Sequence, residues 1–155
     1  MEENSCVIYG HDKFIYTSRL RKLVFSDFEE LIVKYNVVHF FEGRQNDFCQ
    51  FAKQVLVDLQ SKYPQIKIYN FNMHEKYKKR EFVMLNPQEI FNFANIFINN
   101  TPQEFMFYSD LYKKLSIIDE CDYCYFILDT KNYHSVTRIA YDYAESKNKA
   151  IIKLP

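Results

Sequence analysis

Three short groups of residues have side chains that suit the binding of an anionic small molecule. In the first, Gly10 and His11, the imidazole could donate to a phosphate or act as an acid or a base; the alternative is a histidine that caps a turn. The second group consists of Gly43, Arg44, Gln45 and Asn46. It precedes an apolar stripe with helical spacing, and the N–H groups at the start of a helix attract anions. Arg44 would add a two-pronged hydrogen bond to a phosphate or carboxylate, whereas Asn46 could simply be the helix N-cap.

The third group stands at the start of the last helical segment and contains Ser135, Thr137 and Arg138. Capping of that helix explains the two hydroxyls, while anion binding explains all three residues. Asp129 ends the preceding apolar run, where a carboxylate could accept a hydrogen bond from a ribose hydroxyl or serve as a base. His11 and Asp129 are therefore the two candidates for catalysis, and no partner carboxylate can be assigned to Asp129.

The cysteines do not form a recognisable metal site. Cys121 and Cys124 have the spacing C-x-x-C, but no second pair supplies the remaining ligands of a structural zinc ion. We interpret Cys121 as the end of a helix and Cys124 as part of a strand, with a redox pair as the alternative. The sequence thus predicts neither a metal nor another cofactor.

Alternating strand-like and helix-like segments must position these residues. Apolar runs at residues 5–10, 36–41, 66–71, 123–128 and 150–154 are typical of buried strands. Helical spacing follows the first two runs, with Thr17 or Ser18 as the N-cap of the first helix. The first helical stripe consists of Leu20, Leu23, Val24, Phe28, Leu31 and Ile32. The second consists of Phe48, Phe51, Ala52, Val55, Leu56 and Leu59. Further helical segments cover residues 87–99, 110–120 and 135–146.

This order of segments predicts an α/β fold over residues 1–155, as a single Rossmann-like domain. The expected architecture is a three-layer sandwich with a mostly parallel five-stranded sheet and a helical insertion before the fourth strand. Doubly wound order places strands 5–10 and 123–128 side by side, and such sheets bind ligands outside the carboxyl ends of their strands. We therefore expect the three groups to converge into one pocket there. If the side chains of Asn46 and Val136 fill that space instead, the module is a scaffold.

Charge and composition narrow the classes of partner. The formal net charge is zero, so no long-range field attracts nucleic acid or an acidic membrane, and we interpret the basic residues 76–80 as a solvated loop. The acidic N-terminus is unlike a signal peptide and no apolar run could span a bilayer, which predicts a cytoplasmic protein.

The phenylalanines that exceed one helical face are Phe91, Phe93, Phe97, Phe105 and Phe107. They predict an interface with a protein partner or a second copy, or a lid over the crevice.

Several of these residues belong to a series of motifs that resembles a known family. The motifs are Y-G-H at 9–11, G-R-Q-N-D-F at 43–48, Y-P-Q-I-K at 63–67, K-K-L-S-I-I-D-E-C-D at 113–122 and S-V-T at 135–137. Their order resembles the SLOG superfamily, the Rossmann-like group that contains the cytokinin-activating LOG enzymes and the DNA-processing proteins of bacterial transformation. The resemblance is nearest to small bacterial members of uncharacterised function. It covers nearly the whole chain and implies a nucleotide-derived ligand.

The sequence departs from the family at positions that serve phosphate binding and catalysis. Asn46 and Val136 stand where the family usually has glycine, Cys49 where it has aspartate, and Asp12 where an arginine follows Gly-His. Nothing matches the Pro-Gly-Gly-x-Gly-Thr motif around the catalytic Arg and Glu of the LOG enzymes. These departures imply a module, or the remnant of one, that binds its ligand without turning it over.

Two other functions remain as alternatives to this binding module. The first is an enzyme that hydrolyses or transfers at the N-glycosidic bond of a nucleoside or nucleotide, with His11 and Asp129 as its working groups. The second is a protein-interaction or host-directed regulatory factor that uses the aromatic surface.

Overall fold

The computed structural model describes residues 2–10, 17–44, 46–70, 115–128 and 136–154. The strands are β1 (Asn4–Tyr9), β2 (Val37–Glu42), β3 (Lys67–Tyr69), β4 (Tyr123–Ile127) and β5 (Ala150–Leu154). The helices are α1 (Ser18–Tyr35), α2 (Asp47–Lys62) and α5 (Val136–Ser146), together with a short helical stretch at residues 115–120.

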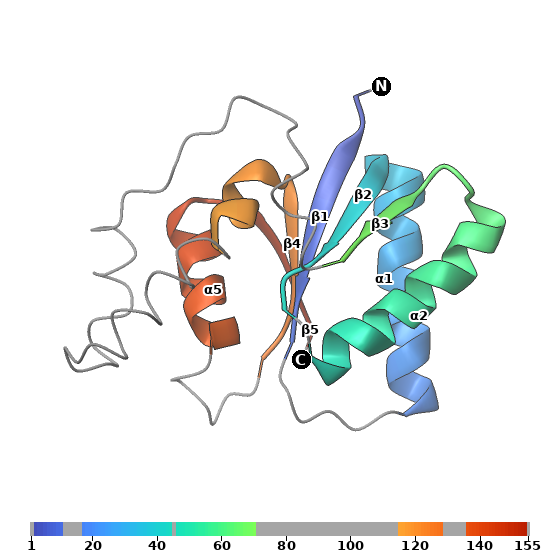
Figure 1. The fold of residues 1–155 in the computed structure, drawn as a ribbon, viewed down its shortest axis with the longest axis horizontal. Coiled ribbons are helices and arrows are strands. Elements are labelled where there is room, and N and C mark those ends of the chain that lie inside the picture. The colour runs from blue at the N-terminus through green and yellow to red at the C-terminus, as the bar shows by residue number, and fades with distance from the viewer. Residues whose placement is uncertain (1, 11–16, 45, 71–114, 129–135, 155) are drawn as a thin grey trace.

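The described strands form one parallel sheet of five strands in the order β3-β2-β1-β4-β5. Helices flank this sheet, so the α/β prediction of a Rossmann-like three-layer sandwich is confirmed (Figure 1). β1 lies at the centre and pairs with both β2 and β4, as doubly wound order requires. The expected helix at 87–99, the basic segment 76–80 and the phenylalanines between 91 and 107 lie outside the described residues.

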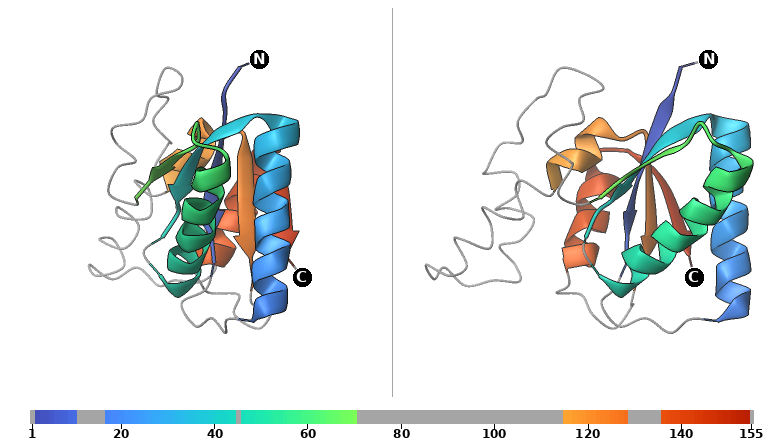
Figure 2. Two further views of the ribbon diagram at one scale, coloured as in Figure 1. Left: turned by 90° about the vertical axis from the view of Figure 1, so that its right-hand side faces the viewer. Right: turned by 45° about the vertical axis from the view of Figure 1, so that its right-hand side comes forward.

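Side chains alternate across the central strand and build two cores. Cys6 and Ile8 of β1 belong to the core under α1 and α2. Val7 and Tyr9 point the other way, into the core under α5 and residues 115–120. The views in Figures 1 and 2 agree that α1 and α2 cover one face of the sheet and α5 the other. Because both faces are covered, the strands are apolar along most of their length.

Helix α1 begins where the sequence predicted. The side chain of Thr17, which has extended backbone angles, accepts a hydrogen bond from the N–H of Leu20. The helix ends at Tyr35, because Asn36 takes the left-handed conformation with φ 51° and its N–H bonds to the carbonyl of Leu31.

One residue of the first predicted stripe is misplaced. Val24, Phe28, Leu31 and Ile32 are buried, whereas Leu23 is 43% exposed and the prediction for it was wrong. Each residue turns the helix by about 100°, so Leu23 lies at the edge of the stripe, beyond the side of the helix that faces the sheet. Val24, the next residue, is fully buried on the side of the helix that faces the sheet.

Helix α2 matches its prediction throughout. All six residues of the second stripe are buried against the sheet. Asn46 is the N-cap, and the helix stops at Lys62, before Tyr63 and Pro64.

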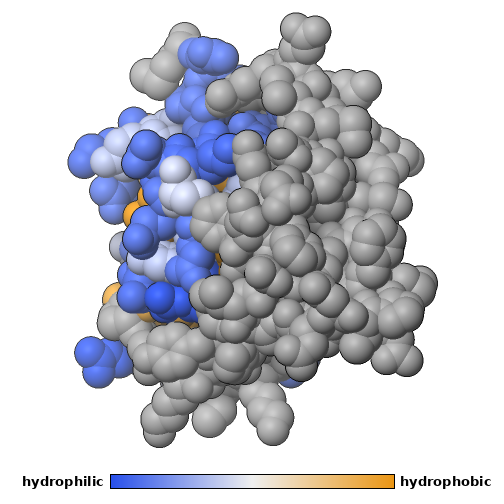
Figure 3. Space-filling view, turned by 90° about the vertical axis from the view of Figure 1, so that its left-hand side faces the viewer, coloured by the Kyte–Doolittle hydropathy of each residue, from blue (hydrophilic) through white to orange (hydrophobic). Residues whose placement is uncertain are grey.

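The side of the molecule that carries α5 has a mainly hydrophilic surface where its residues are described (Figure 3). Within the described ranges, none of the helices combines the length and the apolar character that crossing a bilayer demands.

Candidate functional site

The ends of the central strands meet at the carbonyl group of Gly10, just beyond β1. This oxygen accepts hydrogen bonds from Asn46 Nδ2 at 2.6 Å and from Thr137 Oγ1 at 2.8 Å. The Arg44 guanidinium in turn donates from Nη1 to Thr137 Oγ1 at 3.4 Å. We call Gly10, Arg44, Asn46 and Thr137 the Gly10 junction. It joins the carboxyl end of β1, the segment after β2 and the starts of α2 and α5.

Asn46 ties a helix to a strand. Its Oδ1 accepts from the N–H of Cys49 at 3.0 Å and so caps α2, while its Nδ2 donates to the Gly10 carbonyl. The side chain is buried, at 8% exposure, and both ends of its amide group are bonded within the protein. The N-cap interpretation of Asn46 is confirmed, and the same side chain also fixes the end of β1.

The two glycines of the chain are required by close packing. A Cβ atom at Gly10 would lie 2.1 Å from Cδ1 of Phe48, and one at Gly43 would lie 2.5 Å from Cε1 of Tyr9. Neither glycine has a positive φ, so neither is needed for an unusual backbone angle. The N–H of Gly43 bonds to the carbonyl of Ile8 at 2.7 Å and extends the contact between β1 and the chain leaving β2.

The two arginines of the predicted site have different surroundings. Arg44 is partly exposed and points to Thr137 within the junction. Arg138 instead pairs with Asp142 one turn along α5, with Nε and Oδ1 3.3 Å apart, and its guanidinium lies 5.4 Å from the ring centroid of Tyr141. Among the described residues of the site, Arg44 is therefore the cation that the junction holds in place.

The structure brings together part of each predicted group. Gly10, Arg44, Asn46 and Thr137 are connected by hydrogen bonds, so these four residues of the predicted site lie together, whereas the pocket expected between the three groups stays a prediction. Gly43 lies next to Arg44, and Arg138 lies next to Thr137 but engages its own helix. His11, Gln45, Asp129 and Ser135 lie outside the described residues, as does the side chain of Val136.

Sequence reasoning missed the aromatic walls of the junction. Phe48 was assigned to the apolar stripe of α2 and Tyr9 to the first strand, yet their rings also define the space around Gly10 and Gly43. The sequence signal for these walls was the position of the two glycines at the ends of adjacent strands. A glycine in or beside a strand often marks a place where neighbouring atoms approach the backbone closely.

The described thiols are unsuited to nucleophilic chemistry at neutral pH. All four cysteines are free and buried. Burial raises the pKa of Cys49 and of Cys124 to about 12, and it raises the pKa of Cys121 as well. Cys121 follows the helical stretch 115–120 and Cys124 lies in β4, as the helix-and-strand interpretation expected. Among the described residues, no three His, Cys, Asp or Glu side chains gather so as to hold a metal ion.

Comparison with known proteins gives no assignment. No protein-family model matches the chain, and no curated protein matches it significantly. The resemblance to the SLOG superfamily therefore stays a prediction from the motifs, and the functional argument depends on the Gly10 junction.

Proposed function

We propose that the protein binds an anionic, nucleotide-derived small molecule beside the Gly10 junction and does not transform it. The observation that carries the proposal is the placement of Arg44 where the starts of α2 and α5 meet the carboxyl end of β1. Parallel α/β sheets bind ligands at this position. The amino ends of two helices and a guanidinium all favour negative charge there.

Thr137 orients Arg44 for this task. Its Oγ1 donates to the Gly10 carbonyl and accepts from Arg44 Nη1, so the hydroxyl fixes one corner of the guanidinium relative to β1. A guanidinium has five N–H donors in a rigid fork, and the bond to Thr137 uses one of them. This arrangement is compatible with a bidentate contact between Arg44 and a phosphate.

The described groups of the junction hold charge but do not transfer protons. A guanidinium group is a permanent cation in proteins, and an amide does not titrate. Burial raises the pKa of the nearby Cys49 thiol to about 12, so it is protonated at neutral pH. These properties support binding without turnover.

The proposal is tested by measuring thermal unfolding with a panel of nucleotides, cyclic nucleotides and ADP-ribose, followed by calorimetric titration of any hit. A ligand at 100 times its dissociation constant should stabilise the protein by about 2.7 kcal/mol. Arg44→Met should weaken binding by about tenfold or more, since it removes a charge-assisted pair. Arg21→Met is the matched control, because Arg21 pairs with the exposed Asp58 on the outer side of α1 and α2.

Two results would overturn the proposal. If no compound in the panel raises the melting temperature at millimolar concentration, the junction is only a structural joint. If chromatography after incubation detects free base, the protein is an enzyme acting on N-glycosidic bonds, and Asp129→Asn should then abolish the release.

A further inference from the structure

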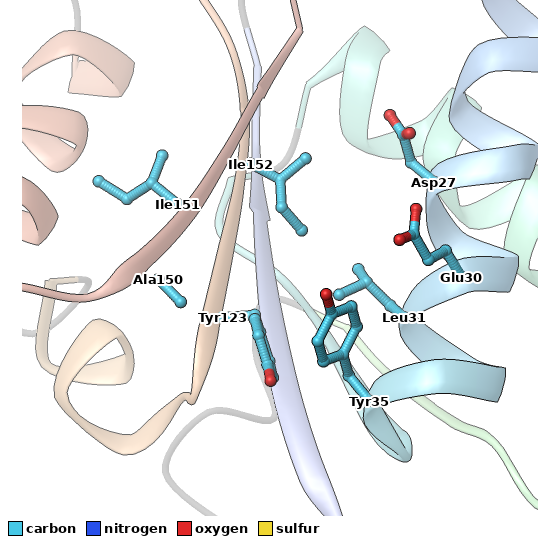
Figure 4. Close-up of a pocket in the computed structure, with 8 residues that line it drawn as sticks. All are labelled: Asp27, Glu30, Leu31, Tyr35, Tyr123, Ala150, Ile151 and Ile152. Carbon is cyan, nitrogen blue, oxygen red and sulfur yellow. The ribbon is translucent and has the colours of Figure 1, made fainter.

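A cavity lies at the other end of the sheet from the Gly10 junction. Its volume is about 350 Å³, and it lies between the second half of α1 and the first residues of β4 and β5 (Figure 4). Tyr35 is the last residue of α1, and Tyr123 is the first residue of β4. The cavity therefore opens at the amino ends of the strands, beside the edge strand β5.

Two tyrosines and two aliphatic residues give the cavity apolar walls. The rings of Tyr35 and Tyr123 have centroids 5.5 Å apart with an interplanar angle of 51°. Leu31 is buried on the helix side, and Ile152 is half-buried on the strand side. Tyrosine rings attract cations over their faces, because the π electrons make each face negative.

Two carboxylates from the same helix complete the lining. Asp27 and Glu30 stand on α1 above the tyrosines in Figure 4. Asp27 Oδ2 accepts a hydrogen bond from the hydroxyl of the fully buried Tyr125 at 2.7 Å. Burial and this carboxylate raise the pKa of Tyr125, so the hydroxyl keeps its proton and stays a donor. A buried group thus fixes the carboxylate of Asp27 at the cavity.

Two further features affect the charge at the site. The carboxyl end of α1 carries a partial negative charge, which adds to that of the side chains. The ammonium group of Lys34 lies beside two of the lining residues and partly offsets the charge of Glu30. Lys34 Nζ lies 3.7 Å from Glu30 Oε1 and 5.3 Å from the ring centroid of Tyr35. Carboxylate and ring here already accommodate a primary ammonium group.

We propose that this cavity binds an organic ammonium cation with an apolar body. The ammonium group would lie near Asp27 and Glu30, and the apolar body would pack against Tyr35, Tyr123 and Ile152. The site is independent of the anion site at the Gly10 junction, because it uses different residues at the opposite end of the sheet.

The probe for this site is 2-phenylethylamine, a primary ammonium ion attached to an aromatic body. Titration of the ¹⁵N-labelled full chain should give saturable shifts of amide signals at the end of α1 and the starts of β4 and β5. The neutral 2-phenylethanol and the anionic phenylacetate have nearly the same shape. Both should bind about tenfold more weakly or not at all, because they lack the charge. Binding of the amine should also weaken as salt is added.

Variants separate this site from a general effect of negative charge. Glu30→Gln and Tyr35→Leu should each weaken binding of the amine by about fivefold. Glu29→Gln is the matched control, since Glu29 is adjacent on α1 but pairs with Lys62 of α2. Lys34→Met should tighten binding, because it removes the internal ammonium group that competes with the probe. Unchanged amide spectra elsewhere will show that each variant is folded.

Three outcomes would overturn the proposal. The first is equal affinity for the amine and the alcohol, which would make the cavity a merely apolar groove. The second is equal weakening by Glu29→Gln and Glu30→Gln. The third is a dimer in light scattering that covers the cavity and prevents shifts there, which would make this surface an interface between two copies of the chain.

Discussion

Gly10 is confined by the ring of Phe48, and this confinement can be measured. Gly10→Ala places a Cβ atom where the Phe48 ring lies, and the ring is fully buried and cannot swing into solvent. Overpacking of this kind should lower the free energy of unfolding by about 1–3 kcal/mol in urea denaturation. The double variant Gly10→Ala/Phe48→Leu should lose less than the sum of the two single losses, because the smaller side chain leaves room for the methyl group.

Strict additivity of the two losses would contradict this explanation. It would mean that the alanine is accommodated by a shift of the backbone and that Phe48 does not fix the identity of residue 10.

At the same scale, the strand order predicted which residues of the site would lie together, but not which hydrogen bonds would join them. The doubly wound order was enough to bring Gly10, Arg44, Asn46 and Thr137 to one place. The bond from Thr137 to the Gly10 carbonyl spans 127 positions of the chain and depends on one side-chain rotamer. His39 shows the same limit. His39 is buried, and its two ring nitrogens are hydrogen-bonded to Tyr69 and Glu3. Nothing in the local sequence names those partners.

The two N-caps offer a comparison at the scale of whole helices. Thr17 caps α1 with a single exposed hydrogen bond, whereas Asn46 caps α2 and also holds β1 through the Gly10 carbonyl. Thr17→Ala should lower the free energy of unfolding by about 1 kcal/mol, the usual effect of losing a cap. Asn46→Ala should lower it by about 2–3 kcal/mol, because a buried acceptor loses a donor in addition to the cap.

Chemical denaturation of the two variants under the same conditions measures this difference. Equal losses would show that the bond from Asn46 to Gly10 adds no stability. Asn46→Asp is a useful third variant, because it keeps the capping oxygen but replaces the donor to the Gly10 carbonyl by an acceptor with negative charge.

Element boundaries followed the sequence closely where the chain is buried. The apolar runs of the sheet and the stripe of α2 are long, and each matched an observed strand or helix. β3 covers Lys67–Tyr69, and of the predicted range 66–71 residues 66 and 70 lie outside the strand while residue 71 lies outside the described residues. β3 is an edge strand and pairs only with β2. A residue at its end can therefore leave the sheet without breaking hydrogen bonds to a second strand. The second strand-like run was predicted to end at residue 41, whereas β2 ends at Glu42, which pairs with Ile8 in the register of the sheet.

For the molecule as a whole, the buried thiols predict loss of stability in alkali. Burial raises the pKa of Cys49 and Cys124 from 9.0 to about 12. Between these values the unfolded chain releases protons that the folded chain keeps, so the free energy of unfolding must fall as pH rises from 9.0 towards 12. Each thiol contributes a slope of up to about 1.4 kcal/mol per pH unit.

Urea denaturation at several pH values above 9, with a reducing agent present, tests this prediction. Cys124→Ala should make the decline with pH shallower by the contribution of one thiol. Val55→Ala is the matched control, because it also truncates a buried side chain but removes no titratable group. Parallel declines for the wild type and Cys124→Ala would contradict the assignment.

The central place of β1 also determines the order in which the sheet can assemble during translation. β1 precedes the other strands in the chain and leaves the ribosome before them, yet one of its two partners, β4, begins only at Tyr123. β2 and β3 can pair beside β1 earlier, with α1 and α2 covering one face. Translation proceeds at about 5–20 residues per second, so the other edge of β1 waits several seconds for its partner. During that interval the nascent chain presents an open, apolar strand edge, the kind of surface on which chaperones act and neighbouring chains aggregate.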